Sequence, residues 1–334
     1  MLRANRIRPD QSQVVPRVLA AALSSREPQK FLDHRTTGMA ESQVNFSNRT
    51  LLNTRVRLPP LPEQRRIAEI LDTVDEAIRK TEEVIAKLEQ MKQGLLHDLL
   101  TRGIDENGEL RDPERHPEQF KDSPLGGIPR EWDTEQLERL TTKIVDGVHK
   151  TPVYTDRGIP FITVENLTRG AGISFSPSRF VSRRDHREYW RRAPVAPGDV
   201  LVSKDGTLGV ARTVPGDAPE FSIFVSVALL KPRTEVISSD FLRLFFESGQ
   251  FFRQLRHLSA GSGLQHIHLS HFRQFQLPLP SLMEQQRILT RVQVSEQTIA
   301  AERQDLEKLQ TLKRGLMDDL LTGRVCVNVD EEAT

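Results

Sequence analysis

The sequence is poor in the features that mark secreted, membrane-bound and disulfide-stabilised proteins. It has one cysteine, Cys326, which excludes an internal disulfide and a cysteine-based metal site. No apolar run approaches the ~18 residues of a membrane helix, and residues 1–6 lead into no apolar signal core. With 47 basic and 46 acidic residues, the net charge is +1, and the total charge gives no overall bias toward a nucleic-acid partner. We therefore expect a cytoplasmic protein with no membrane partner, in which any nucleic-acid site depends on how charge is distributed.

The motifs of common nucleic-acid enzymes are also missing. None of the 11 lysines has an acidic residue two positions before it, where many restriction nucleases place one to flank a metal-bound water. No Gly-Lys pair exists for a phosphate-binding loop, and Pro59-Pro60 is not followed by the aromatic residue of an amino-methyltransferase motif. His266 and His268 could ligate a metal, but no nearby acid or cysteine completes the set. We assign no catalytic and no metal-binding residues.

A long internal repeat dominates the chain. Residues 58–104 align with residues 279–325 at a constant offset of 221, without a gap, and 17 of the 47 aligned positions are identical. The identical positions include Glu63-Gln64, which align with Glu284-Gln285. The period is far longer than the ~20 to 50 residues of a solenoid repeat. The sequence therefore predicts a duplicated module, in which one kind of helix recurs after an intervening domain.

Each repeat is predicted to form one long helix that begins just after a proline or a small polar residue. Apolar residues recur at alternating steps of four and three, which is the 3.5-residue spacing of a coiled-coil seam. The seam residues are Ile67, Leu71, Val74, Ile78, Ile85, Leu88, Ile288, Val292, Ile299, Leu306 and Leu309. A helix of about 38 residues is roughly 57 Å long. We expect the two helices to pair antiparallel as a spacer of fixed length; the alternative is two amphipathic helices that lie on separate globular cores.

The region between the helices changes in texture near residue 127. Residues 105–127 are polar and rich in turn formers, which predicts a surface linker. Residues 128–280 contain short apolar runs separated by glycine and proline, followed by a helical pattern near residues 239–257. The expected fold is therefore α+β: a mixed domain at 128–280, helices at 58–104 and 281–325, and a tail at 326–334.

Positive charge is concentrated inside this central domain. Residues 128–280 hold 20 basic and 16 acidic residues, a net charge of +4. Tyr189 and Trp190 lie among the arginines of the densest segment, as in many nucleic-acid-binding surfaces. The candidate DNA contacts are Arg179, Arg183, Arg184, Arg187, Arg191, Arg192 and Lys204, with Gln265 and His266 as possible base readers. The alternative is a solvated helix face whose arginines pair with nearby acids.

Several motifs together resemble the specificity (S) subunits of type I restriction-modification systems. Glu-Gln-Arg-Arg-Ile at 63–67 resembles the start of that family's spacer helices, and residues 94–103 resemble their end. Ile-Pro-Arg-Glu-Trp at 128–132 resembles the start of a target recognition domain, and residues 158–167 and 198–209 resemble its interior strands. The resemblance covers most of the chain.

The resemblance implies a non-catalytic subunit that selects a DNA sequence for its partners. Double-stranded DNA would be bound by the target recognition domain, and the spacer helices would dock methyltransferase (M) subunits. A restriction and translocase (R) subunit would join through the complex. S-adenosylmethionine, ATP and magnesium are then expected on the partner subunits, with no cofactor on this chain.

The sequence departs from the family before residue 58, where a first recognition domain is expected. Residues 1–57 resemble only the C-terminal remnant of such a domain, as if its front two-thirds were lost. We expect residues 1–50 to be loosely ordered, with apolar side chains such as Val18 and Leu19 poorly buried. An alternative function follows, in which a truncated chain binds the methyltransferase subunit as a scaffold but does not recognise DNA.

Overall fold

The computed structural model describes residues 7–35, 47–176, 179–258 and 266–328. The chain divides into two compact units, one of residues 1–88 with 298–334 and the other of residues 89–297. The two long helices, α4 (Leu61–Thr101) and α11 (Leu282–Thr322), each have 41 residues and contribute to both units. We call the two parts the outer unit and the domain unit and describe each by itself.

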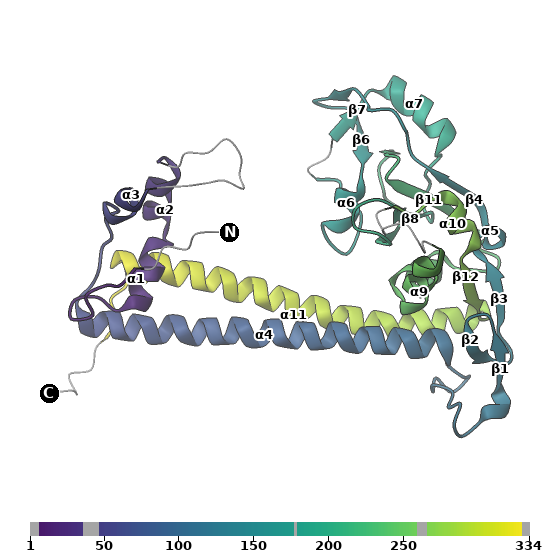
Figure 1. Cartoon of the computed structure of the whole chain (residues 1–334), viewed down its shortest axis with the longest axis horizontal. Coiled ribbons are helices and arrows are strands. Elements are labelled where there is room, and N and C mark those ends of the chain that lie inside the picture. The colour runs from purple at the N-terminus through teal and green to yellow at the C-terminus, as the bar shows by residue number, and fades with distance from the viewer. Residues whose placement is uncertain (1–6, 36–46, 177–178, 259–265, 329–334) are drawn as a thin grey trace. The chain divides into compact units, whose positions relative to one another are not determined.

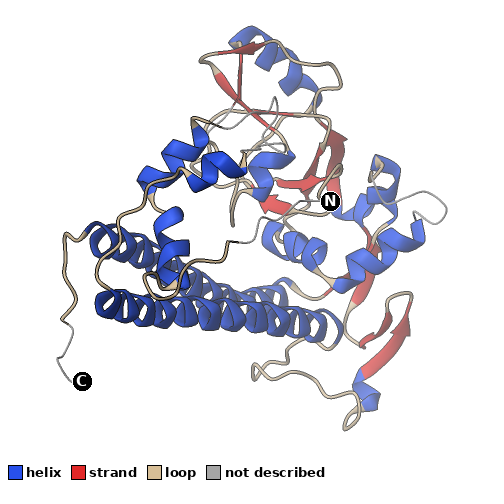
Figure 2. Cartoon of the chain, turned by 60° about the vertical axis from the view of Figure 1, so that its left-hand side comes forward, coloured by secondary structure: helices blue, strands red, loops and turns tan. Residues whose placement is uncertain are grey.

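The long helices lie side by side and antiparallel (Figures 1 and 2). In the outer unit, Ile67 near the start of α4 shares a core with Leu320 near the end of α11. In the domain unit the order is reversed, and Leu96 near the end of α4 shares a core with Ile288 near the start of α11. The predicted antiparallel pair is confirmed.

Most of the predicted seam residues point into the helix pair. The buried ones are Ile67, Leu71, Val74, Ile85, Ile288, Val292 and Ile299. The half-buried ones are Ile78, Leu88, Leu306 and Leu309. Among the predicted seam residues, burial is therefore most complete toward the start of each helix.

Ion pairs repeat across the helix pair with the roles of the helices exchanged. In the domain unit, Lys92 of α4 donates to Glu296 of α11 at 2.8 Å. In the outer unit, Lys313 of α11 lies 2.6 Å from Asp75 of α4. Both residues of the first pair align with those of the second at the offset of 221. The sequence repeat is thus also a repeat of contacts.

The outer unit contains three short helices before α4: α1 (Pro16–Leu23), α2 (Arg26–Asp33) and α3 (Asn48–Leu52). The expectation that Val18 is poorly buried is wrong, because Val18 is 0% exposed. It packs with Ile67, Leu71 and Leu320, since the apolar face of α1 covers the helix pair. Leu19 is half-buried, and residues 1–6 and 36–46 of the segment expected to be loose lie outside the described residues.

A glutamine near the start of each long helix fixes the short helix packed beside it. In the outer unit, the side-chain oxygen of Gln64 accepts the N–H of Val15, the residue that precedes α1, at 2.8 Å. In the domain unit, Gln285 accepts the N–H of Ser238, the residue that precedes α8 (Ser239–Glu247), at 2.8 Å. Both glutamine amides also donate to the carbonyl two residues before that N–H. The hydrogen bonds that anchor α1 to α4 are therefore repeated in those that anchor α8 to α11.

The domain unit contains the mixed domain. Its remaining helices are the 3-10 helix η2 (Pro117–Gln119), α5 (Leu137–Leu140), α6 (Val164–Thr168), α7 (Arg183–Arg192), α9 (Gly249–Leu258) and α10 (Leu269–Gln274). Its strands are β1 (Phe120–Ser123), β2 (Gly126–Pro129), β3 (Asp133–Gln136), β4 (Thr141–Asp146), β5 (Tyr154–Thr155), β6 (Ile159–Ile162), β7 (Arg179–Val181), β8 (Val200–Ser203), β9 (Ala211–Thr213), β10 (Ser222–Ile223), β11 (Val227–Pro232) and β12 (Gln276–Leu279). The segment expected as a linker, 105–127, thus includes η2, β1 and the first residues of β2.

The central sheet has the strand order β4-β11-β8-β9 and is antiparallel throughout. Val200 of β8 and Leu230 of β11 face one hydrophobic core, whereas Leu201 and Leu229 face another. Side chains alternate between the faces of a strand, so a run of apolar residues fills both cores at once. This explains why these strands read as continuous apolar runs in the sequence.

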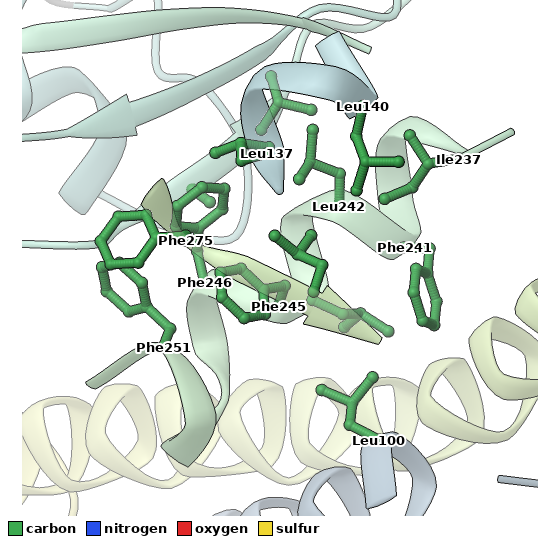
Figure 3. Packing of buried hydrophobic residues seen from close by; sticks show 14 of the residues in the cluster. Leu100, Leu137, Leu140, Ile237, Phe241, Leu242, Phe245, Phe246, Phe251 and Phe275 are labelled. Atoms are coloured by element: carbon green, nitrogen blue, oxygen red, sulfur yellow. The ribbon is translucent and has the colours of Figure 1, made fainter. Parts of the chain in front are cut away.

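One of these cores is built around phenylalanines that follow the sheet in sequence. Figure 3 shows Phe245, Phe246, Phe251 and Phe275 gathered with Leu100 of α4. Phe251 and Phe275 meet edge-on, with ring centroids 5.0 Å apart. The C-terminal end of α4 is therefore part of the same core as α8, α9 and β12.

Candidate nucleic-acid interface

Sheet topology brings Asp146 and Lys204 to the same edge. Strands β4 and β8 both pair antiparallel with β11, so they run in the same direction on either side of it. Asp146 ends β4, and Lys204 directly follows β8. The loops that begin at these residues therefore leave the sheet together.

Asp146 is surrounded by basic side chains. We call this group the Asp146 cluster; its members are Asp146, His149, Arg192, Lys204 and His266. Arg192 donates to the buried carboxylate at 2.5 Å, His149 Nε2 lies 3.0 Å away and Lys204 Nζ 3.4 Å away. Burial acts to raise the pKa of Asp146, but the hydrogen bonds from Arg192 and His149 and the charge of Lys204 outweigh it, so the net pKa is lowered. A negative group thus holds two part-exposed basic side chains, Arg192 and His149, at the surface.

Lys204 differs from the expectation of a direct DNA contact, because it is 3% exposed. Its Nζ lies 3.3 Å from His266 Nε2, and the other ring nitrogen of His266 bonds Asp205. Lys204 is thus enclosed between Asp146 and His266. His266 is half-buried, and Gln265 lies outside the described residues.

Helix α7 carries the densest set of exposed arginines. Its N-terminus is capped by Ser182, whose hydroxyl accepts the N–H of Asp185, and its inner face buries His186 and Tyr189. The outward face holds Arg184, Arg187, Trp190 and Arg191, at the three- and four-residue spacings of one helix face. Among the described residues, none of these three arginines has a carboxylate within ion-pair distance. We call Arg184, Arg187 and Arg191 the α7 arginines.

The other candidate arginines have local partners. Arg183 lies 3.4 Å from Glu220, and Arg192 belongs to the Asp146 cluster. Arg179 of β7 stacks on Tyr154, with its guanidinium carbon 5.2 Å from the ring centroid. The alternative of locally paired arginines therefore describes Arg183 and Arg192 but not the α7 arginines.

The structure thus places most of the described candidates in two groups, the outer face of α7 and the Asp146 cluster. Arg179 and Arg183 belong to neither group, because they contact Tyr154 and Glu220. Sequence reasoning missed Asp146, His149 and Tyr154, because their arginine partners, Arg192 and Arg179, lie 25 to 46 positions away in the sequence. The arginine run of α7 was found, because its members are close together in sequence.

The surroundings of α7 offer little room for a small molecule. A hollow of about 50 Å³ lies beside the helix, lined by His186, Trp190 and Phe221 among others. Small-molecule sites are typically ~300–1,000 Å³. Among the residues that the structure describes, no group of three or more His, Cys, Asp or Glu side chains is placed to hold a metal ion. Nor does any helix in the described ranges combine the length and apolar character needed to cross a membrane.

A cluster of arginines without paired carboxylates, beside an exposed tryptophan on one helix, is typical of a nucleic-acid-binding surface. The family model for the type I restriction modification DNA specificity domain matches residues 6–90 and 131–311. The chain belongs to this family.

Individual relatives agree with this assignment. The chain is 26% identical over 313 residues to the type I restriction enzyme MjaVIII specificity subunit of Methanocaldococcus jannaschii, covering 90% of this chain and 68% of that protein. It is 27% identical over 257 residues to the EcoBI specificity subunit of Escherichia coli, covering 75% of this chain and 53% of that protein.

Solved structures show a similar fold. A structure described in terms of complex assembly and conformational transition of the type I R-M system matches with a TM-score of 0.53 and 21% identity, over 96% of this chain and 74% of that one. The type I restriction-modification S subunit from M. genitalium matches with a TM-score of 0.50 and 16% identity, over 93% of this chain and 74% of that one.

Proposed function

We propose that this chain selects the DNA sequence on which a type I restriction-modification complex acts. Residues 128–280 would bind double-stranded DNA, while M subunits methylate it and an R subunit cleaves it. S-adenosylmethionine, ATP and magnesium would be bound by those partners, and this chain would perform no catalysis itself.

The observation that carries the proposal is the outer face of α7. Its α7 arginines extend from a helix whose inner face is locked by His186 and Tyr189, so their spacing is set by the fold. Unpaired guanidinium groups are suited to phosphate oxygens, which position a protein on DNA without reading its sequence. Side chains around the Asp146 cluster would then contact the base edges, since Arg192 and His149 are part-exposed there.

The test is to co-express the chain with the methyltransferase subunit encoded beside it, in a host without DNA methylation. Single-molecule sequencing then maps the modified adenines. We expect one short sequence motif, which is methylated less completely when the α7 arginines are replaced by alanine and as completely as before when Arg139 is replaced. Arg139 is a suitable control because it lies on α5 beside Glu135. Methylation without any motif would refute sequence selection by this chain.

A second candidate function is a scaffold that binds the methyltransferase subunit without recognising DNA. It is favoured by apolar side chains that the long helices expose, including Val84, Met91 and Leu312, which are 45%, 59% and 51% exposed. Such residues are suited to packing against another protein. A stable complex with the methyltransferase subunit that leaves no modified motif would favour this function.

A further inference from the structure

The domain unit contains a fully enclosed glutamate at the start of α11. Glu284 is 3% exposed and accepts the N–H of Ile104 at 2.9 Å and the indole N–H of Trp132 at 2.9 Å. Arg111 donates to it at 2.5 Å. Gly103, with φ +66, allows this close approach, because a Cβ there would lie 2.4 Å from both Glu284 and Trp132. One carboxylate thus joins the end of α4 to the start of the recognition domain.

The outer unit contains the same carboxylate without its enclosure. Glu63 aligns with Glu284 at the offset of 221 and occupies the same position in α4. It is half-buried, and the N–H of Val327 lies 3.4 Å from its Oε1. No tryptophan or arginine bonds it among the described residues. Among the described residues after α11, Glu63 therefore meets a single backbone N–H, whereas Glu284 receives a backbone N–H, Arg111 and Trp132 from the chain after α4.

The space around Glu63 is also more open than the space around Glu284. Val325, which aligns with Ile104, is 51% exposed, whereas Ile104 is 3% exposed. Gly323 also ends its helix with a positive φ of +71, yet a Cβ on it would meet nothing within 4 Å. Beneath this opening, Leu320 and Leu321 are buried as their counterparts Leu99 and Leu100 are. The buried leucines are thus present at both sites, but no described residue covers Glu63 as Arg111 and Trp132 cover Glu284.

We propose that the site around Glu63 binds a segment of a second polypeptide that presents a tryptophan and an arginine, as Trp132 and Arg111 are presented to Glu284. The indole N–H and the guanidinium would bond the carboxylate, and the indole ring would cover Val325 and Gly323. This chemistry complements an acidic, partly apolar site and is already realised once in the same fold.

The sequence has two tryptophans, and neither bonds Glu63 in the described part of the chain, so we take the tryptophan of this site to lie on a second polypeptide. Trp132 is held by Glu284, and Trp190 lies on α7; both are in the domain unit. The partner we infer is a polypeptide that carries the start of a target recognition domain. Docking at Glu63 is independent of DNA binding by residues 128–280, so the two proposals fail separately.

The test uses the full chain and a synthetic peptide of its own residues 111–133 as the probe. Cys326 is exposed, is the single cysteine and adjoins Val325 and Val327, so a bimane dye attached there reports a nearby tryptophan by quenching. We expect saturable quenching by the peptide and none by the same peptide with Trp132→Ala. Anisotropy of a fluorescein-labelled peptide on the unlabelled protein checks that the dye itself does not alter binding.

The decisive variant is Glu63→Gln, which keeps the shape of the side chain and removes its charge. We expect it to weaken peptide binding about tenfold, as for loss of a charge-assisted hydrogen bond, with an unchanged melting temperature. The matched control is Glu82→Gln, an exposed residue of the same helix, which should bind as the wild type does. Equal affinity of the Glu63→Gln variant, or no anisotropy change at millimolar peptide, would overturn the proposal.

Discussion

Replacing the three α7 arginines by alanine should flatten the salt dependence of DNA binding by the full chain. Among the described residues no carboxylate pairs with Arg184, Arg187 or Arg191, so each is free to meet one phosphate. Each such contact contributes about 0.9 to the slope of log K against log salt, so the triple variant should lower the slope by about 2.7. Between about 50 and 200 mM salt, the wild type should then lose about 40-fold more affinity than the variant.

The assay is fluorescence anisotropy with a labelled duplex of any sequence, since phosphate contacts do not depend on the bases. The triple variant should melt with the wild type, because the substituted side chains lie outside the core of the domain. Arg139→Ala, which removes an arginine beside Glu135, serves as the control and should keep the wild-type slope. A triple variant with an unchanged slope would refute the placement of DNA phosphates on α7.

Three further predictions concern stability. In chemical denaturation, Glu284→Gln should lower the unfolding free energy by about 3 kcal/mol, because Arg111 loses a buried charged partner. Glu63→Gln should lower the unfolding free energy by less than about 1 kcal/mol. Equal losses for the two variants would contradict this prediction. Gln64→Ala and Gln285→Ala should each cost about 1–3 kcal/mol, since each leaves a helix-start N–H unbonded, and an unshifted urea midpoint would count against the prediction. Since the folded pKa of Asp146 lies below its ordinary value, the wild type should exceed Asp146→Asn in stability above about pH 4 and lose that advantage as pH falls further; a difference that persists in strong acid would be inconsistent.

The paired helices could be predicted from the sequence because their information is local and periodic. The steps of four and three through Ile67 and Leu71 define a face, and the offset of 221 shows that the same face occurs twice. Neither feature depends on knowing where any other segment lies. The arginines of α7 were identified for a similar reason, because ten consecutive residues carry the pattern.

Properties set by contacts distant in sequence could not be predicted in this way. Val18 gives no sign of its burial, because its partners lie about fifty and three hundred positions further along the chain. Lys204 looks like any surface lysine until β4 and β8 bring Asp146 beside it. The charge of a side chain is visible in sequence, but whether that charge is free or neutralised depends on the fold.

Because the central sheet packs against a hydrophobic core on each face, its residues tolerate few substitutions, whereas exposed residues elsewhere in the domain tolerate many. Every side chain of Val200–Ser203 is buried, so each substitution in β8 would be felt by one core or the other. The outer face of α7 contributes to neither of those cores. A lineage could therefore acquire new substitutions there at little risk to folding, and the scaffold would be inherited while its surface diverges. Such an arrangement makes the protein evolvable, because selection on binding and selection on stability act on different residues.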